Sequence, residues 1–212
     1  VTTGSVYHWS MEGQQSPKRV FQIHDNLANA TVISYKISKS GKWLLLTALK
    51  KEGEVMKGVM QLYSVDRNVS QPIDGHAGDF MEYRFTDGST TTLLCMASNL
   101  PNKQKLFVMD VNQTKKFSNV QQNVPFQSGQ DFPVAMQSSE KHGIIFLVTK
   151  LGILFMFDAK SGTLLFKNRI TSDTIFVSTK SDCGLLGINK SGQVLSVSID
   201  DTSIISYLTQ NN

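Results

Sequence analysis

The chain has 212 residues, of which 40% are hydrophobic and 18% are charged, and its formal net charge at pH 7 is +4. This composition is typical of a globular protein with a buried core, and it excludes an extended disordered chain. Lysine and arginine occur in runs of at most two residues, so the sequence alone carries no footprint for nucleic acid or for a membrane surface.

The first apolar segment, within residues 1–13, contains Val-Tyr-His-Trp and is expected to be the last hairpin of a preceding propeller blade. Four similar units follow, each with two apolar segments joined by a turn and closed by an aspartate. The closing residues Asp66, Asp110, Asp158 and Asp200 are 44, 48 and 42 residues apart. Repeats of this length, with one hairpin in each unit, are typical of β-propeller blades.

Each unit supplies two apolar segments that we expect to pair as antiparallel strands. They are 43–49 with 61–66, 93–97 with 105–110, 144–149 with 153–158, and 185–189 with 193–200. Turns rich in glycine, serine and asparagine at 39–42, 158–162 and 189–192 favour short hairpins.

The strands of the third unit are apolar at both even and odd positions, as in Ile144–Val148 and Ile153–Phe157. A strand in a two-layer sandwich alternates apolar and polar residues, so this pattern favours strands covered on both faces, as in stacked blades. The segment Gln193–Ile199 alternates more regularly, which predicts a half-exposed outer strand.

We therefore predict an all-β fold: a partial β-propeller of about four and a half four-stranded antiparallel blades over residues 1–200. The expected parts are a blade remnant at 1–13, blades at 29–75, 79–122, 131–170 and 173–200, and the start of a helical linker at 201–212. Such a number of blades does not close a ring, so a larger propeller is expected. Three loops, 50–57, 99–104 and 112–123, are expected to be irregular, and partner preference is expected to depend on them.

The sequence shows no motif for catalysis, for a metal or for a cofactor, and the prediction is that the chain has none of these sites. The four histidines lack partners at metal-ligand spacing, and there is no glycine-rich phosphate loop or Gly-x-Ser-x-Gly elbow. Glu52 and Glu54 lie in a lysine-rich, solvated loop. Gly75-His76 is similar to the Gly-His pair of WD repeats, where the histidine has a structural hydrogen-bonding role.

Cys95 and Cys183 lie in apolar strand patterns and are interpreted as buried, reduced thiols of a cytosolic protein. No signal peptide and no apolar span of 18 residues is recognisable in the sequence. Two other function classes stay open at this point. One is a propeller enzyme with its active site in the central channel, which the scattered carboxylates disfavour, and the other is a generic WD-type scaffold of another coat or complex.

Several segments closely resemble the clathrin heavy chain, and the likeness runs from end to end. The segments are Val6–Gly13, Lys42–Thr47, Met60–Arg67, Asp131–Gln137 and Gly192–Val197. The resemblance implies the amino-terminal seven-bladed propeller of that family, entered near the end of the third blade, with Ile204–Thr209 beginning the helical linker.

The resemblance also implies a function, that of a non-enzymatic vesicle coat component in intracellular transport and endocytosis. The propeller would bind short peptide motifs of adaptor and accessory proteins, on the cytoplasmic face of coated pits and coated vesicles. The parent protein would be a trimer with light chains. Nucleic acid is not an expected partner, and the membrane would be reached only indirectly, through adaptors.

Two of the family's peptide sites are represented in the chain, whereas the clathrin-box groove of the first two blades is not. The arrestin-type groove between the fourth and fifth blades matches Trp43, Leu46, Leu62, Arg67, Val69 and Gln71. The apolar side chains would form its floor, and Arg67 with Gln71 would bind peptide carbonyls. Trp43, Leu46 and Leu62 also suit the core of any blade.

The tryptophan-box pocket at the propeller centre is partly matched by Thr31, Ile33 and Leu49. Ile33 and Leu49 keep the apolar character of that pocket. Thr31 stands where the family usually has a glutamine, so a side-chain amide is missing there, a loss of about 1 to 3 kcal/mol if its partner stays unpaired.

Overall fold

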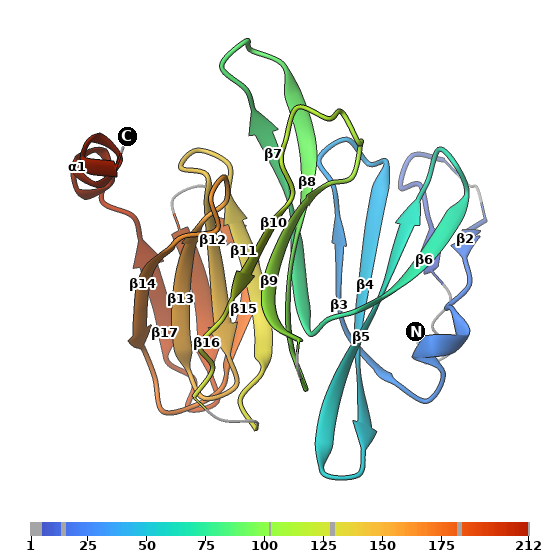
Figure 1. Ribbon diagram of the computed structural model, residues 1–212. Coiled ribbons are helices and arrows are strands. Elements are labelled where there is room, and N and C mark those ends of the chain that lie inside the picture. The colour runs from blue at the N-terminus through green and yellow to red at the C-terminus, as the bar shows by residue number, and fades with distance from the viewer. Residues whose placement is uncertain (1–5, 14–15, 102, 128–129, 182–183, 212) are drawn as a thin grey trace.

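Figure 1 shows the computed structural model, which describes residues 6–13, 16–101, 103–127, 130–181 and 184–211. The described chain is nearly all β, with a short 3-10 helix η1 (Asp25–Leu27) and one α-helix, α1 (Asp201–Asn211). Four antiparallel meanders stand side by side from the blue to the red end of the chain (Figure 1). The expected all-β class and the helix near the C-terminus are confirmed.

Each of the first three meanders has four strands in sequence order. The first sheet consists of β3 (Thr31–Ile37), β4 (Trp43–Glu52), β5 (Val55–Ser64) and β6 (Val69–Asp74). The second sheet consists of β7 (Ala77–Arg84), β8 (Thr90–Leu100), β9 (Lys103–Asp110) and β10 (Val120–Asn123). The third sheet consists of β11 (Pro133–Ser139), β12 (Ile144–Thr149), β13 (Ile153–Asp158) and β14 (Leu164–Arg169).

The fourth sheet has three strands within the described residues, in place of the expected four. They are β15 (Ile175–Ser181), β16 (Gly184–Asn189) and β17 (Val194–Ser198). Side chains along β17 alternate between exposed and half-buried, as expected for an outer strand. Cys183 lies outside the described residues, whereas Cys95 is completely buried, as expected.

The hairpins expected in the four units are confirmed as the pairs β4–β5, β8–β9, β12–β13 and β16–β17. Two glycines of the expected turns adopt positive φ, a region that favours glycine: +70° at Gly41, between β3 and β4, and +79° at Gly192, between β16 and β17. At the N-terminal end, β1 (Val6–His8) pairs with β2 (Lys18–Phe21), so this hairpin extends beyond the expected segment 1–13.

Two loops that were expected to be irregular are strand pairs, so that expectation was wrong. The pairing of β4 with β5 continues to Glu52 and Val55, and only Gly53 and Glu54 form the turn. The pairing of β8 with β9 likewise continues to Leu100 and Lys103. Backbone hydrogen bonds extend both hairpins beyond the apolar part of their strands, which is why side-chain polarity gave the wrong answer.

The core is divided into layers between neighbouring sheets. Leu45, Met60 and Leu62 of the first sheet pack against Phe80, Leu94 and Met96 of the second. A larger layer between the second and third sheets includes Leu106, Val108, Phe155 and Phe157. A third layer joins the third and fourth sheets. Strands between two such layers are covered on both faces, as β12 is from Ile144 to Thr149.

Candidate functional site

The expected groove residues meet at a cavity of about 280 Å³ between the first and second sheets, here called the outer groove. Five of the six residues expected for this site line it: Trp43, Leu62, Arg67, Val69 and Gln71. Further lining residues were not expected, because most of them come from the second sheet. They include Ile73, Leu94, Met109, Asp110, Val111, Gln113 and Asn119.

Leu46 is the one expected residue that does not line the outer groove. Residues three apart in a strand lie on opposite faces, so Leu46 points away from the face that carries Trp43. Its side chain is buried instead with Leu27, Ala48 and Val59, on the side of the first sheet that faces η1.

The wall of the outer groove is fixed by hydrogen bonds from the second sheet. The indole Nε1–H of Trp43 donates to Asn112 Oδ1 at 3.2 Å, although 69 residues separate the two in sequence. The backbone N–H of Asn112 donates to Asp110 Oδ1 at 3.0 Å, and the Asn112 amide donates to Thr91 Oγ1 at 3.3 Å. The orientation of Trp43 therefore depends on the loop that follows β9.

Asp110 anchors that loop. Burial acts to raise its pKa, but hydrogen bonds from Thr114, from Thr91 and from backbone amides outweigh burial and hold the pKa below its ordinary value. The carboxylate accepts from Thr91 Oγ1 at 2.7 Å and from the backbone N–H of Thr114 at 2.8 Å. Its oxygens are thus used within the protein.

The first sheet provides the opposite, solvent-facing rim. Val69, the first residue of β6, is 57% exposed, and Arg67 and Gln71 are also exposed. Within the described residues, the Arg67 guanidinium makes no hydrogen bond or ion pair. An exposed apolar side chain beside a guanidinium with available N–H donors suits an extended peptide, which offers both apolar side chains and carbonyl oxygens.

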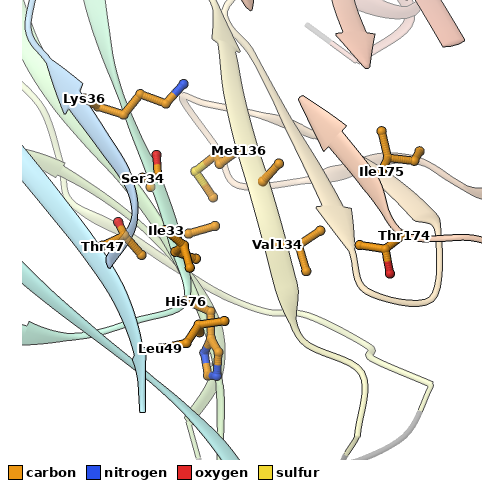
Figure 2. A pocket seen from close by; sticks show the side chains of 13 residues that line it. Ile33, Ser34, Lys36, Thr47, Leu49, His76, Val134, Met136, Thr174 and Ile175 are labelled. Atoms are coloured by element: carbon orange, nitrogen blue, oxygen red, sulfur yellow. The ribbon is translucent and has the colours of Figure 1, made fainter. Parts of the chain in front are cut away.

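A second cavity, of about 330 Å³, lies where β3, β7, β11 and the start of β15 approach one another, and is here called the central cavity. Figure 2 shows Ile33 and Leu49 on one side of this cavity and Val134, Met136 and Ile175 on the other. Thr31, the third residue expected for this pocket, is exposed at the start of β3 and does not line the cavity.

Polar contacts join the sheets around the central cavity. The Nζ atom of Lys36 lies 3.7 Å from Asp79 Oδ1. Asp79 Oδ2 accepts hydrogen bonds from the backbone N–H and the hydroxyl of Ser138, both at 2.9 Å. One buried carboxylate thus connects β3, β7 and β11.

One group of side chains has the composition of a catalytic triad. Ser139 Oγ lies 3.1 Å from His142 Nδ1, and His142 Nε2 lies 2.7 Å from Asp201 Oδ1. Lys141 Nζ also pairs with Asp201, at 2.8 Å. The hydroxyl of Ser139 is buried at the end of β11 and is out of reach of a substrate, so the group acts as a clasp for α1. Sequence spacing could not reveal it, because Asp201 is remote in the chain.

Two further features concern the part of the chain that the structure describes. There, no three histidine, cysteine, aspartate or glutamate side chains gather closely enough to hold a metal ion. No helix in the same part is long and apolar enough to cross a membrane.

Curated proteins similar to this chain are clathrin heavy chains. Clathrin heavy chain 2 of Homo sapiens is 43% identical over 220 residues, which are 99% of this chain and 13% of that protein. The clathrin heavy chains of Drosophila melanogaster and Dictyostelium discoideum are 40% and 41% identical, over 98% and 100% of this chain. The chain spans only 13% of the length of each of these relatives. No protein-family model matches the chain.

Solved structures with a similar fold include a β-propeller. The Cps50 (Swd1) beta-propeller domain of Myceliophteria thermophila aligns with a TM-score of 0.50 and 13% identity, over 80% of this chain and 54% of that one. The computationally designed Ika4 protein aligns with a TM-score of 0.50 and 15% identity, over 90% of this chain and 96% of that one. Identity at this level supports the propeller fold and not a shared function.

Proposed function

We infer that this chain, which is a homologue of one segment of the clathrin heavy chains, is a non-enzymatic part of a vesicle coat. Its propeller sheets serve as a platform for short peptide motifs of adaptor and accessory proteins, at the cytoplasmic face of coated pits and vesicles. As the resemblance implied, the parent protein is proposed to be a trimer with light chains. The homology supports the coat role, and the outer groove supports the peptide role.

The observation that carries the peptide role is the convergence of five expected residues on one cavity between two sheets. Four of them belong to strands of the first sheet, namely Trp43, Leu62, Val69 and Gln71, whereas Arg67 lies in the turn before β6. Their types combine an apolar floor with polar groups at the rim, which is the usual design of a peptide-binding groove. The proposed occupant is a leucine-rich, arrestin-type loop.

The proposed binding mode divides the work between the floor and the rim. Leucine side chains of the ligand contact Trp43 and Leu62, while Arg67 and Gln71 donate hydrogen bonds to ligand carbonyls. A cavity of about 280 Å³ holds few side chains, so a single contact is weak. Many such contacts in a coat add up through multivalency.

The central cavity is a second candidate site for peptides. Ile33 and Leu49 line it together with Val134, Met136 and Ile175, so it offers an apolar surface to an inserted side chain. We propose it as a tryptophan-box-like pocket in which Thr31 takes no part, because this residue does not line it.

The test is a calorimetric titration of the chain with a leucine-rich loop peptide of the arrestin type, repeated with the double variant Arg67→Ala and Gln71→Ala. We expect binding in the micromolar range or weaker, and a loss of at least tenfold in the variant. A matched control, Arg84→Ala with Gln121→Ala, removes the same groups from exposed positions that do not line the groove. It should bind as the wild type does.

Two results would contradict the proposal. Absence of binding to the wild-type chain at millimolar peptide would leave the outer groove without its proposed ligand. Equal binding by the double variant and the wild type would place the peptide elsewhere on the sheets.

A further inference from the structure

His76 lies between the first two sheets and is completely buried. The backbone N–H of Asn99, in β8, donates to the ring atom Nδ1 at 3.2 Å. On the other side of the ring, Nε2 lies 3.0 Å from the carbonyl oxygen of Met56, and the backbone N–H of Gly58 donates to Nε2 at 3.2 Å. Met56 and Gly58 both belong to β5. One imidazole thus connects the backbones of two different sheets.

The neighbouring backbone leaves this ring little freedom to move. The connection before β7 passes so close to β5 that a Cβ atom on Gly58 would stand 2.3 Å from the carbonyl oxygen of Gly75. The backbone N–H of Gly75 donates to the carbonyl oxygen of Gly58 at 3.1 Å, and the backbone N–H of His76 donates to the carbonyl oxygen of Ala97 at 2.9 Å. The ring therefore stays in place only while these segments stay together.

The hydrogen bonds determine which form of the ring fits. A neutral ring with its proton on Nε2 accepts from the Asn99 N–H at Nδ1 and donates to the Met56 carbonyl, while the Gly58 N–H also points at Nε2. A second proton would have to sit on Nδ1, directly opposite the Asn99 N–H. The charged ring thus loses one inter-sheet hydrogen bond and places two donors against each other.

No carboxylate near the ring compensates for that loss. Within the described residues, three ion pairs lie on the surrounding strands: Lys57 with Glu52 at 3.9 Å, Lys36 with Asp79 at 3.7 Å, and Lys103 with Asp74 at 3.5 Å. None of these pairs includes the imidazole.

Asp131 is a buried residue just before β11, and its backbone carbonyl accepts from the Asn99 side-chain amide. Its carboxylate forms no ion pair with the ring, and its Oδ2 has no hydrogen-bond partner among the described residues. Asp131 Oδ1 accepts from the backbone N–H of Leu151 at 3.1 Å. The ring of Phe132 lies 5.4 Å from the imidazole, and Lys150 Nζ lies 5.4 Å from the Phe132 ring. The imidazole therefore faces an aromatic ring and a cation beyond it.

We propose that His76 is an acid-sensitive latch, which joins the first and second sheets while its ring is neutral and lets them separate locally when the ring is protonated. Burial lowers the pKa of His76 below its ordinary value of 6.5, and the hydrogen bond to Met56 offsets this only in part. The closed junction therefore binds fewer protons than an opened one. Its stability is complete above about pH 6.5 and decreases as the pH falls below that value.

Opening of the latch is also expected to weaken ligand binding. Of the consequences of the latch, only this effect on binding rests on the proposed function. His76 itself lines the central cavity, and the outer groove lies between the same two sheets. Separation of these sheets at low pH would disrupt both sites. The opening itself can be measured without any ligand, so the two proposals can fail independently.

The test is amide hydrogen exchange of the wild-type chain by NMR at pH 7.5 and pH 5.5, corrected for intrinsic exchange rates. We expect the protection of the Gly58 and Asn99 amides to fall by up to about tenfold, the limit set by proton binding to an opened histidine with an ordinary pKa. The reference is the buried central strand of the third sheet, at Phe146 and Leu147. Its corrected protection should change less than twofold.

A His76→Gln variant, which cannot titrate, should show the same protection at Gly58 and Asn99 at both pH values. If that variant does not fold, the comparison of the two regions in the wild type still decides the question. Unchanged protection at Gly58 and Asn99 would overturn the latch. An equal loss of protection at Phe146 and Leu147 would overturn it too, because the chain would then open globally and not locally.

Discussion

The junction between the first and second sheets and the junction between the second and third sheets have the same architecture but different surfaces. The first junction opens into the outer groove, beside the half-buried side chains of Trp43 and Met109. In the second junction, Tyr83, Phe117, Val120, Phe126 and Leu164 pack against the core. The same stacking of two sheets thus produces a groove at one boundary and a packed aromatic layer at the next.

The difference comes from the segment that follows the third strand of each sheet. In the first sheet, residues 65–68 form a short turn between β5 and β6. In the second sheet, residues 111–119 form a longer loop that places Phe117 against Tyr83, with ring centroids 5.3 Å apart. Val120 lies close to Gly162. A Cβ atom added to Gly162 would stand 2.5 Å from Val120 Cγ1. A groove persists where the turn is too short to fill it.

The largest expected effect is the loss of an aromatic ring from the second junction. Phe155 is completely buried, stacks on Phe157 at 6.0 Å and meets Phe126 edge to face. Phe155→Ala should lower the free energy of unfolding by about 3–5 kcal/mol, measured by urea denaturation. The control Phe166→Ala, from a ring that is 43% exposed, should cost about 1 kcal/mol or less. Similar costs for both variants would mean that the second junction is not tightly packed.

The next effect concerns the carboxylate that reaches both junctions. Asp79→Ala leaves the buried Ser138 N–H without its acceptor and removes the partner of Lys36. We expect a loss of about 1–3 kcal/mol in the free energy of unfolding, again by urea denaturation. The exposed pair of Lys42 with Asp66, at 3.0 Å, provides the control, since Asp66→Ala should change stability by less than about 1 kcal/mol. A smaller loss for Asp79→Ala than for Asp66→Ala would contradict this account.

The groove itself can be filled to imitate the second junction. Val69→Phe places a ring at the rim of the outer groove, where Val69 is already 57% exposed, so folding should change by less than about 0.5 kcal/mol. Binding of the leucine-rich peptide should weaken at least tenfold, or about 1.4 kcal/mol, in a calorimetric titration. Val194→Phe makes the same change at another exposed strand start, away from the groove, and should leave binding intact. Unimpaired binding by Val69→Phe would show that the ligand does not enter the groove.

Repeat spacing was sufficient to predict the hairpins, because each unit carries its own apolar pair of strands and its own turn. The extended hairpin around Gly53 was not predicted, because the polar residues near its tip pair through their backbones. Leu46 is a different kind of error. Strand alternation already places residues 43 and 46 on opposite faces, so the sequence itself held the information that separates Leu46 from Trp43.

The second wall of the outer groove could not be predicted from the sequence. Asn112 and Asp110 belong to the next repeat, and their position beside Trp43 depends on how the two sheets pack against each other. The clasp of Asp201 with His142 has the same cause, because it joins α1 to a turn of the third sheet. Contacts within one repeat follow from local pattern, whereas contacts between repeats depend on the arrangement of the sheets.

The smallest expected effect tests whether the second sheet shapes the groove of the first. Asn112→Ala removes the acceptor of the Trp43 indole N–H, but water can replace it because Trp43 is only half-buried. Unfolding should therefore change by less than about 1 kcal/mol, while peptide affinity falls about two- to fivefold as the indole loses its fixed orientation. Asn123→Ala, at an exposed position of β10 that does not line the groove, is the matched control. If both variants bind equally well, the shape of the groove is set by the first sheet alone. A loss confined to Asn112→Ala would mean that recognition is a property of the pair of sheets and that neither carries the site by itself.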